Sequence, residues 1–198
     1  MSRLIKCLIL TFAALSVLGA GDKDKTPFKA APASSYEYKL AVDGLLVAVQ
    51  PFDNDELVKS AFGKLNPNQY SVLPVLVVMQ NDSKKPLRLD NIKVELVLPN
   101  RDRVEATPAS DVRYARAPKR PNMGNPLPFP RRVGKNPLDK PEIEERAFAA
   151  KVILPGESAS GFFYFQTGYR GGSTFYLTGV KDAQSGQELF YFEIPLAR

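Results

Sequence analysis

Short runs of apolar residues, either alternating with polar residues or continuous, recur along the chain after residue 35. Residues 36–50 (YEYKLAVDGLLVAVQ) contain two such runs separated by Asp43 and Gly44, which predicts a strand, a turn or bulge, and a second strand. Residues 75–80 (VLVVMQ) are apolar almost throughout and predict a buried strand. Residues 92–98 alternate and predict a strand with one buried face. The dominant period is therefore that of β-structure.

Strand patterns return in the last third of the chain. Residues 161–166 (GFFYFQ) predict a strand, and residues 174–179 and 187–194 flank a polar loop and predict a hairpin. Ten of the twenty aromatic residues lie between Phe162 and Phe192. Large rings in strands fill a sandwich core and form cross-strand pairs, so we expect these aromatics to be core residues. An aromatic platform for a ligand is the alternative.

One segment has the pattern of a helix. Asp53 or Asn54 can accept hydrogen bonds from the free N–H groups of a first turn, and residues 55–65 place an apolar stripe on one face. Residues 142–150 predict either a short helix or an edge strand. Since helices do not recur between the predicted strands, a parallel α/β fold is disfavoured. The elements together predict a mainly all-β fold, an antiparallel immunoglobulin-like β-sandwich with one short helix and a long proline-rich loop. A small open barrel is the alternative.

The first 21 residues have the layout of a cleaved signal peptide. Arg3 and Lys6 precede a mostly apolar run, residues 7–20, that ends in small residues. This run is shorter than the roughly 20 apolar residues of a membrane-spanning helix; an uncleaved signal anchor is the alternative. We therefore predict an extracytoplasmic protein, periplasmic or secreted, that does not span the membrane after cleavage. A flexible linker is expected at residues 22–35 and a single domain at residues 36–198.

A proline-rich insert at residues 108–141 interrupts the regular pattern. It contains eight prolines, and from Arg113 to Pro141 it holds eight basic residues and a single acid, Asp139. Structureless segments of this length in compact domains are usually functional or disordered. The binding residues that we predict are the following cations: Arg113, Arg116, Lys119, Arg120, Arg131, Arg132 and Lys135. They would meet carboxylates or phosphates on a protein or an anionic envelope component, with nucleic acid not expected. The alternative is that the segment packs along the sandwich with its charges solvated.

The composition limits the available chemistry. The chain has no histidine, and its single cysteine, Cys7, would be removed with the signal peptide. The commonest general base and the commonest ligands of transition metals are therefore absent from the predicted mature chain. We predict no catalytic residues, no metal site and no cofactor. The predicted function is a non-enzymatic exported binding or structural module, and the alternative is a carboxylate-dependent enzyme acting on glycan.

Three phrases carry a resemblance to a known group of proteins. They are a strand–turn–strand at residues 73–96, a proline-glycine turn before an aromatic strand at residues 154–165, and a closing strand at residues 186–196. This layout resembles bacterial exported immunoglobulin-like domains of unknown function. The resemblance implies the sandwich fold and assigns no site residue.

Overall fold

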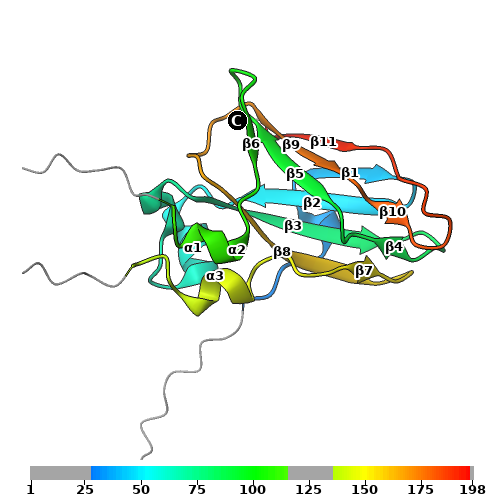
Figure 1. The fold of residues 1–198 in the computed structure, drawn as a ribbon, viewed down its shortest axis with the longest axis horizontal. Coiled ribbons are helices and arrows are strands. Elements are labelled where there is room, and N and C mark those ends of the chain that lie inside the picture. Colours follow the sequence, from blue (N-terminus) through cyan, green and yellow to red (C-terminus); the bar gives the residue numbers. More distant parts are fainter. Residues whose placement is uncertain (1–27, 116–135, 197–198) are drawn as a thin grey trace, which may run out of the picture.

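The computed structural model describes residues 28–115 and 136–196. It is built mostly of antiparallel β-sheets with few helices, as the sequence predicts at this level (Figure 1). The central sheet has the strand order β1-β2-β3-β8, the outer sheet β11-β9-β5-β6, and a small third sheet β10-β4-β7. The strands are β1 Tyr38–Val42, β2 Leu45–Pro51, β3 Leu73–Asn81, β4 Leu87–Arg88, β5 Lys93–Val97, β6 Arg103–Glu105, β7 Val152–Ile153, β8 Ser158–Phe165, β9 Ser173–Thr178, β10 Lys181–Asp182 and β11 Phe192–Leu196.

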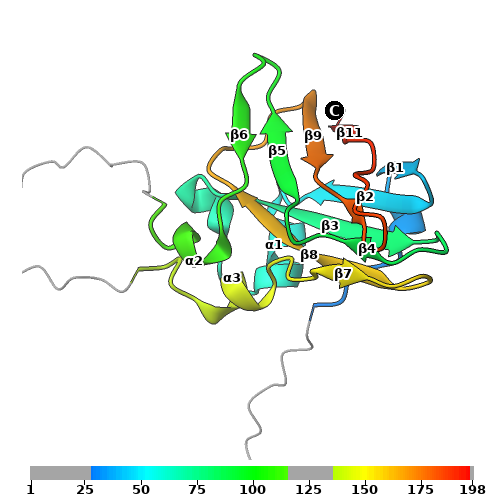
Figure 2. The same ribbon diagram turned by 45° about the vertical axis from the view of Figure 1, so that its right-hand side comes forward.

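The main core lies between the central and outer sheets. Alternate residues of β2 and β3, such as Val47 and Val77, face residues of β5, β9 and β11 such as Leu96, Phe175 and Ile194. Figure 2 shows β5, β6 and β9 standing on one side of the central sheet. Because one face of each strand is dedicated to this core, residues 92–98 alternate in polarity as expected for a sheet with one solvated face.

A second core covers the opposite face of the central sheet. Ala48, Leu76, Val78 and Phe162 point into it from the strands, and the helices pack over them. Helix α1 is Asp55–Phe62, α2 is Ala109–Val112 and α3 is Pro141–Glu145, with 3-10 turns η1 at Ala33–Ser35 and η2 at Pro67–Tyr70. The central sheet is thus buried on both faces, which explains why β3 is apolar almost throughout.

The number of helices corrects the sequence-based expectation of one short helix. Helix α1 forms where predicted but ends at Phe62, because Gly63 adopts φ 64°. The other two are α2, which lies inside the proline-rich insert, and α3, which begins at its last residue; both are too short to show a helical period in the sequence. Residues 28–35, which the sequence assigned to a linker, also pack against the fold: Ala33 is only 1% exposed, and the Phe28 ring lies 5.5 Å from that of Phe162. The predicted signal peptide lies outside the described residues.

The two predicted hairpins differ in how closely they follow the sequence pattern. In the first, β1 and β2 pair through Asp43 and Gly44, whose φ values of 50° and 81° match the left-handed conformation of a tight hairpin turn. In the second, β9 pairs with β11, but β11 begins only at Phe192, and β10 lies between them in the chain. Phe190 and Tyr191 are consequently 74% and 51% exposed instead of lying in the core.

The Asp182 carboxylate joins two turns at the edge of the small sheet. Its oxygens accept hydrogen bonds from the backbone N–H groups of Gln184 (2.8 Å) and Ser185 (3.2 Å) and lie 3.0 Å from Lys85 Nζ. The Gln184 amide, then Lys85 and the Ser185 amide, lower the pKa of Asp182 to about 2 from 3.8.

The lowered pKa predicts a pH-dependent contribution to stability. Since the folded-state pKa of Asp182 lies below the unfolded-state value, its charge stabilises the fold fully above about pH 4. That contribution is lost as the pH falls toward about 2. Asp182→Asn should therefore be less stable than wild type near pH 7, with a difference that shrinks between about pH 4 and pH 2. Urea denaturation across this range measures the difference, and a difference independent of pH would contradict the assignment.

Candidate functional site

Helices α1 and α3 lie at the same end of the molecule (Figure 1). Residues of α1, of η2 and of the segment that carries α3 line a groove there. Helix α1 starts at Asn54, whose side-chain oxygen accepts a hydrogen bond from Leu57 N–H at 2.9 Å. This cap fixes the direction of the helix, and the turn at Gly63 brings the following residues back beside it. The groove has a volume of about 570 Å³.

The lining of this groove carries an excess of positive charge, and we call it the basic groove. Lys59 and Lys64 come from α1 and the turn after it, Lys140 precedes α3, and Arg146 follows α3. Among the described residues that line the groove, Glu142 is the single carboxylate. Such an arrangement favours an anionic ligand through charge complementarity.

Arg146 is the most enclosed of these cations. Its guanidinium carbon lies 5.6 Å from the centre of the Phe62 ring, a cation–π contact. Its Nη1 atom is buried and has no hydrogen-bond partner among the described residues. The backbone of Arg146 is held in place because its carbonyl accepts a hydrogen bond from Phe162 N–H at 2.8 Å.

Tyr164 is a buried residue of β8 that lies near enough to Arg146 to feel its charge. Its hydroxyl donates a hydrogen bond to the Ile143 carbonyl at 2.8 Å, which ties α3 to β8. Burial raises the pKa of Tyr164, and the positive charge of Arg146 partly opposes that effect. The hydroxyl therefore stays protonated and serves as a structural donor.

Arg113 is the one predicted binding residue within the described part of the chain. Its guanidinium lies 2.7 Å from a Glu144 oxygen and 3.4 Å from an Asp139 oxygen, so it links α2 to α3. The side-chain amide of Asn136 also donates a hydrogen bond to the Arg113 carbonyl. The described residues on either side of segment 116–135 are thus joined beside the basic groove. The other six predicted binding residues lie outside the described residues; they are Arg116, Lys119, Arg120, Arg131, Arg132 and Lys135.

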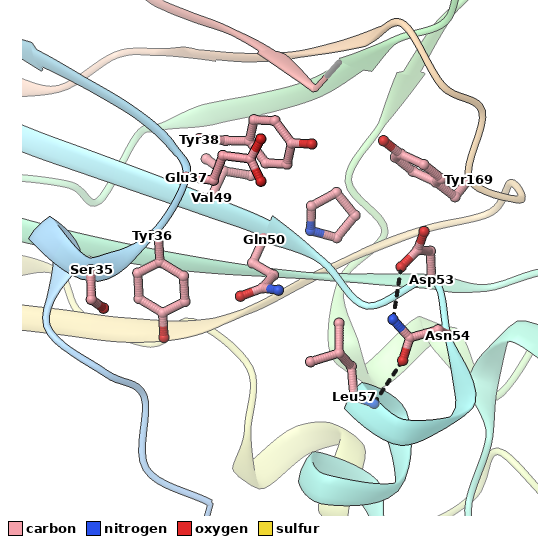
Figure 3. A pocket seen from close by; sticks show the side chains of 11 residues that line it. Ser35, Tyr36, Glu37, Tyr38, Val49, Gln50, Asp53, Asn54, Leu57 and Tyr169 are labelled. Carbon is pink, nitrogen blue, oxygen red and sulfur yellow. Dashed lines mark hydrogen bonds between the residues drawn. The ribbon is translucent and has the colours of Figure 1, made fainter. Parts of the chain in front are cut away.

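A second hollow, which we call the tyrosine pocket, lies near the N-terminus of α1. It has a volume of about 290 Å³ and is lined by tyrosines 36, 38 and 169 together with Gln50 and the carboxylates of Glu37 and Asp53. Figure 3 shows these side chains arriving from different segments, with Asp53 connected to Asn54 and Asn54 to Leu57. The Asn54 amide accounts for both connections, with its Nδ2 lying 3.5 Å from Asp53 Oδ1. The tyrosine pocket is therefore an acidic and aromatic site, opposite in charge to the basic groove.

Sequence reasoning did not find the basic groove. Lys59 and Lys64 lie within residues 55–65, for which the sequence predicts a helix, and Arg146 lies within residues 142–150, whose pattern is ambiguous between a short helix and an edge strand. Their convergence depends on contacts between segments about 80 residues apart, for which a single sequence has no signal. Charge alone pointed to the insert at residues 108–141, of which Pro137 and Lys140 line the groove.

The described residues contain no group of three or more histidine, cysteine, aspartate or glutamate side chains that could hold a metal ion. Within the same ranges, no helix is long and apolar enough to cross a membrane.

No protein-family model and no curated protein matches the sequence. Among solved structures, the crystal structure of a functionally unknown protein from Listeria monocytogenes EGD-e is similar with a TM-score of 0.39. The two chains are 15% identical, and the match covers 83% of each. Similarity at this level carries no conclusion about function.

Proposed function

We propose that the protein is an exported, non-enzymatic module that binds an anionic partner of the cell envelope through the basic end of the molecule. The scaffold in this proposal is an immunoglobulin-like β-sandwich, of the kind found in bacterial exported domains of unknown function. Two antiparallel sheets facing each other across one core support that scaffold.

The observation that carries the proposal is the distribution of charge around the insert. Residues 116–135 contain six basic side chains and no acid, so the segment cannot neutralise itself. The described residues on either side of it, Arg113 and Asn136, are joined by a hydrogen bond next to a groove that is itself lined by four cations. Positive charge from distant parts of the sequence is therefore gathered at one end of the fold. Such a concentration attracts phosphates and carboxylates on a partner and speeds their encounter.

Replacing Arg131 and Arg132 with serine should weaken association with anionic vesicles by about 30-fold at low salt. Each basic residue near an anionic surface contributes about 1 kcal/mol, so two contribute about 2 kcal/mol. Cosedimentation with phosphatidylglycerol vesicles measures the loss, and affinity capture of the tagged protein from its native envelope identifies the partner. The melting temperature should change little, because in this proposal Arg131 and Arg132 contact a partner and do not pack in the core.

The matched control removes two exposed cations elsewhere, Lys93 and Lys151. Lys93→Ser/Lys151→Ser should retain most vesicle binding, because neither residue lines the basic groove. An equal loss of vesicle binding in both double variants would show that net charge, and not the position of the cations, determines the binding. A large fall in the melting temperature of Arg131→Ser/Arg132→Ser would instead assign the segment a structural role.

The tyrosine pocket supports a second candidate, a carboxylate-dependent enzyme acting on glycan. Glu37 and Asp53 line the same pocket, and glycoside hydrolysis usually requires two carboxyl groups beside the scissile bond. Release of reducing sugar by the wild-type protein, abolished in both Glu37→Gln and Asp53→Asn, would favour this candidate. Without such turnover in the wild type, the binding function stands alone.

A further inference from the structure

The guanidinium of Arg146 is enclosed without an acceptor. Its Nη1 is buried and lacks a hydrogen-bond partner in the described chain, while Phe62 covers one face of the group. A buried donor that is left unpaired destabilises a protein, and native structures rarely retain one without a role. The Phe62 contact stabilises the charge but satisfies none of the five N–H donors of a guanidinium. No hydrogen bond holds the guanidinium to another described residue, and Arg146 also lines the groove, so its N–H groups on that side are available to an oxygen acceptor from outside the described chain.

Neighbouring charges specify what kind of acceptor fits. Lys59, Lys64 and Lys140 line the same groove, against the single carboxylate of Glu142. One carboxylate ligand would leave most of this positive charge uncompensated, whereas a phosphate carries close to two negative charges near neutral pH. The planar fork of a guanidinium also matches two phosphate oxygens at once, with lysines adding mobile point charges. The lining therefore favours a phosphate over a carboxylate.

The size and the remaining lining of the groove indicate that the phosphate is attached to an organic group. The volume of about 570 Å³ falls within the range of sites for small organic molecules and is far larger than one phosphate requires. Phe62, Leu65 and Pro137 provide apolar surface beside the cations. An apolar or aromatic substituent could bury part of its surface there while the phosphate meets Arg146.

We propose that the basic groove is a binding site for the phosphate group of an organic phosphate, with Arg146 as its central donor. The inference rests on the proposed function in placing an anionic partner at this end of the molecule, and it names phosphate as the anion. The phosphate could belong to a lipid that ends in a phosphomonoester or to a free organic phosphate, since both present the same terminal oxygens and the same charge to the site. Lys59, Lys64 and Lys140 would hold the remaining charge.

The test uses phenyl phosphate as the probe, with isothermal titration calorimetry on the purified protein. Phenyl phosphate should bind the wild type, and inorganic phosphate should bind more weakly because it lacks the apolar group. Arg146→Lys keeps the charge but loses the fork, and should weaken phenyl phosphate binding by at least about tenfold. Lys93→Gln, an exposed cation of β5 outside the groove, should bind as the wild type does.

Folding is checked by a thermal melt of the same variants. Phenyl phosphate should raise the melting temperature of the wild type and not that of Arg146→Lys, since a ligand stabilises only the state that binds it. No binding to the wild type, or equal binding by wild type and Arg146→Lys, would overturn the proposal. If Arg146→Lys proved too unstable to measure, Lys64→Gln/Lys140→Gln would replace it, with the same expected loss.

Vesicles separate the two sources of phosphate. If the ligand is a lipid headgroup, phenyl phosphate should displace the protein from vesicles that contain phosphatidic acid, whose headgroup is a phosphomonoester, and Arg146→Lys should weaken binding to these vesicles. If the ligand is a free organic phosphate, neither added phenyl phosphate nor the substitution Arg146→Lys should change vesicle binding. Undiminished vesicle binding by Arg131→Ser/Arg132→Ser, together with normal phenyl phosphate binding, would reject the proposed function and keep the phosphate site.

Discussion

Replacing Phe162 with alanine is expected to lower the free energy of unfolding by about 3–5 kcal/mol. Phe162 is 2% exposed and lies at the centre of an aromatic cluster between β8 and the helical layer. Its ring centre is 4.8 Å from that of Phe52, 4.9 Å from that of Phe62 and 5.5 Å from that of Phe28. Truncation removes the buried surface of one ring and leaves a cavity that several other rings line. Because those neighbours belong to different segments, they cannot all move inward to fill it.

Urea denaturation of Phe162→Ala beside Phe190→Ala tests this prediction. Phe190 lies in the same aromatic-rich third of the sequence but is 74% exposed, so its truncation should change stability by less than about 0.5 kcal/mol. If the two substitutions lowered the free energy of unfolding equally, the packing of Phe162 against the helical layer would not be a major source of stability. The comparison of the two variants also distinguishes a core aromatic residue from a surface one, although both lie in stretches of the sequence with the same pattern.

Replacing Gly161 with alanine should destabilise the protein by about 3 kcal/mol through backbone crowding. An added Cβ would lie 2.4 Å from Phe148 Cα and 2.6 Å from Phe148 N, distances that real Cβ atoms essentially never show. The close approach allows Phe148 N–H to donate to the Phe162 carbonyl at 3.0 Å, and Phe162 N–H to donate to the Arg146 carbonyl at 2.8 Å. Alanine would force these segments apart and weaken both hydrogen bonds.

Gly168 provides the matched control, because an added Cβ there meets nothing within 4 Å and its φ is not in the left-handed region. Gly168→Ala should therefore be near neutral. Hydrogen exchange localises the effect: the amides of Phe148 and Phe162 should exchange faster in Gly161→Ala and not in Gly168→Ala. Since the Arg146 carbonyl takes part in the same contact, phenyl phosphate affinity should also fall. A stable Gly161→Ala protein with unchanged exchange would disprove the proposed crowding.

The two stability predictions concern the structure that positions the basic groove. Phe162 supports the helical layer from which Lys59 and Lys64 project, and Gly161 permits the approach that holds Arg146. The groove therefore depends on the packing of the second core more than on any local motif. Loss of phosphate binding in either core variant would accompany loss of stability, whereas Arg146→Lys should lose binding alone.

The sequence by itself determined the features that depend on neighbouring residues. Alternating polarity at residues 92–98 predicts a strand with one buried face, Asp43 and Gly44 predict a turn or bulge, and Asp53 or Asn54 predicts the start of a helix. The structure has the strand β5, a tight turn, and Asn54 as the cap of α1. Each of these follows from backbone sterics, hydrogen bonds or side-chain period within a few residues. The predominance of antiparallel β-structure was predictable for the same reason.

Only the tertiary structure decided which surfaces are covered and which charges meet. The apolar run in β3 predicts burial but not that helices cover its second face, and nothing local distinguishes exposed Phe190 from buried Phe162. Arg146 resembles any other arginine in the sequence, yet the fold encloses it against Phe62 beside lysines from another segment. Burial and Coulomb interactions depend on distances in space, and the chain brings these groups together only when both cores have formed.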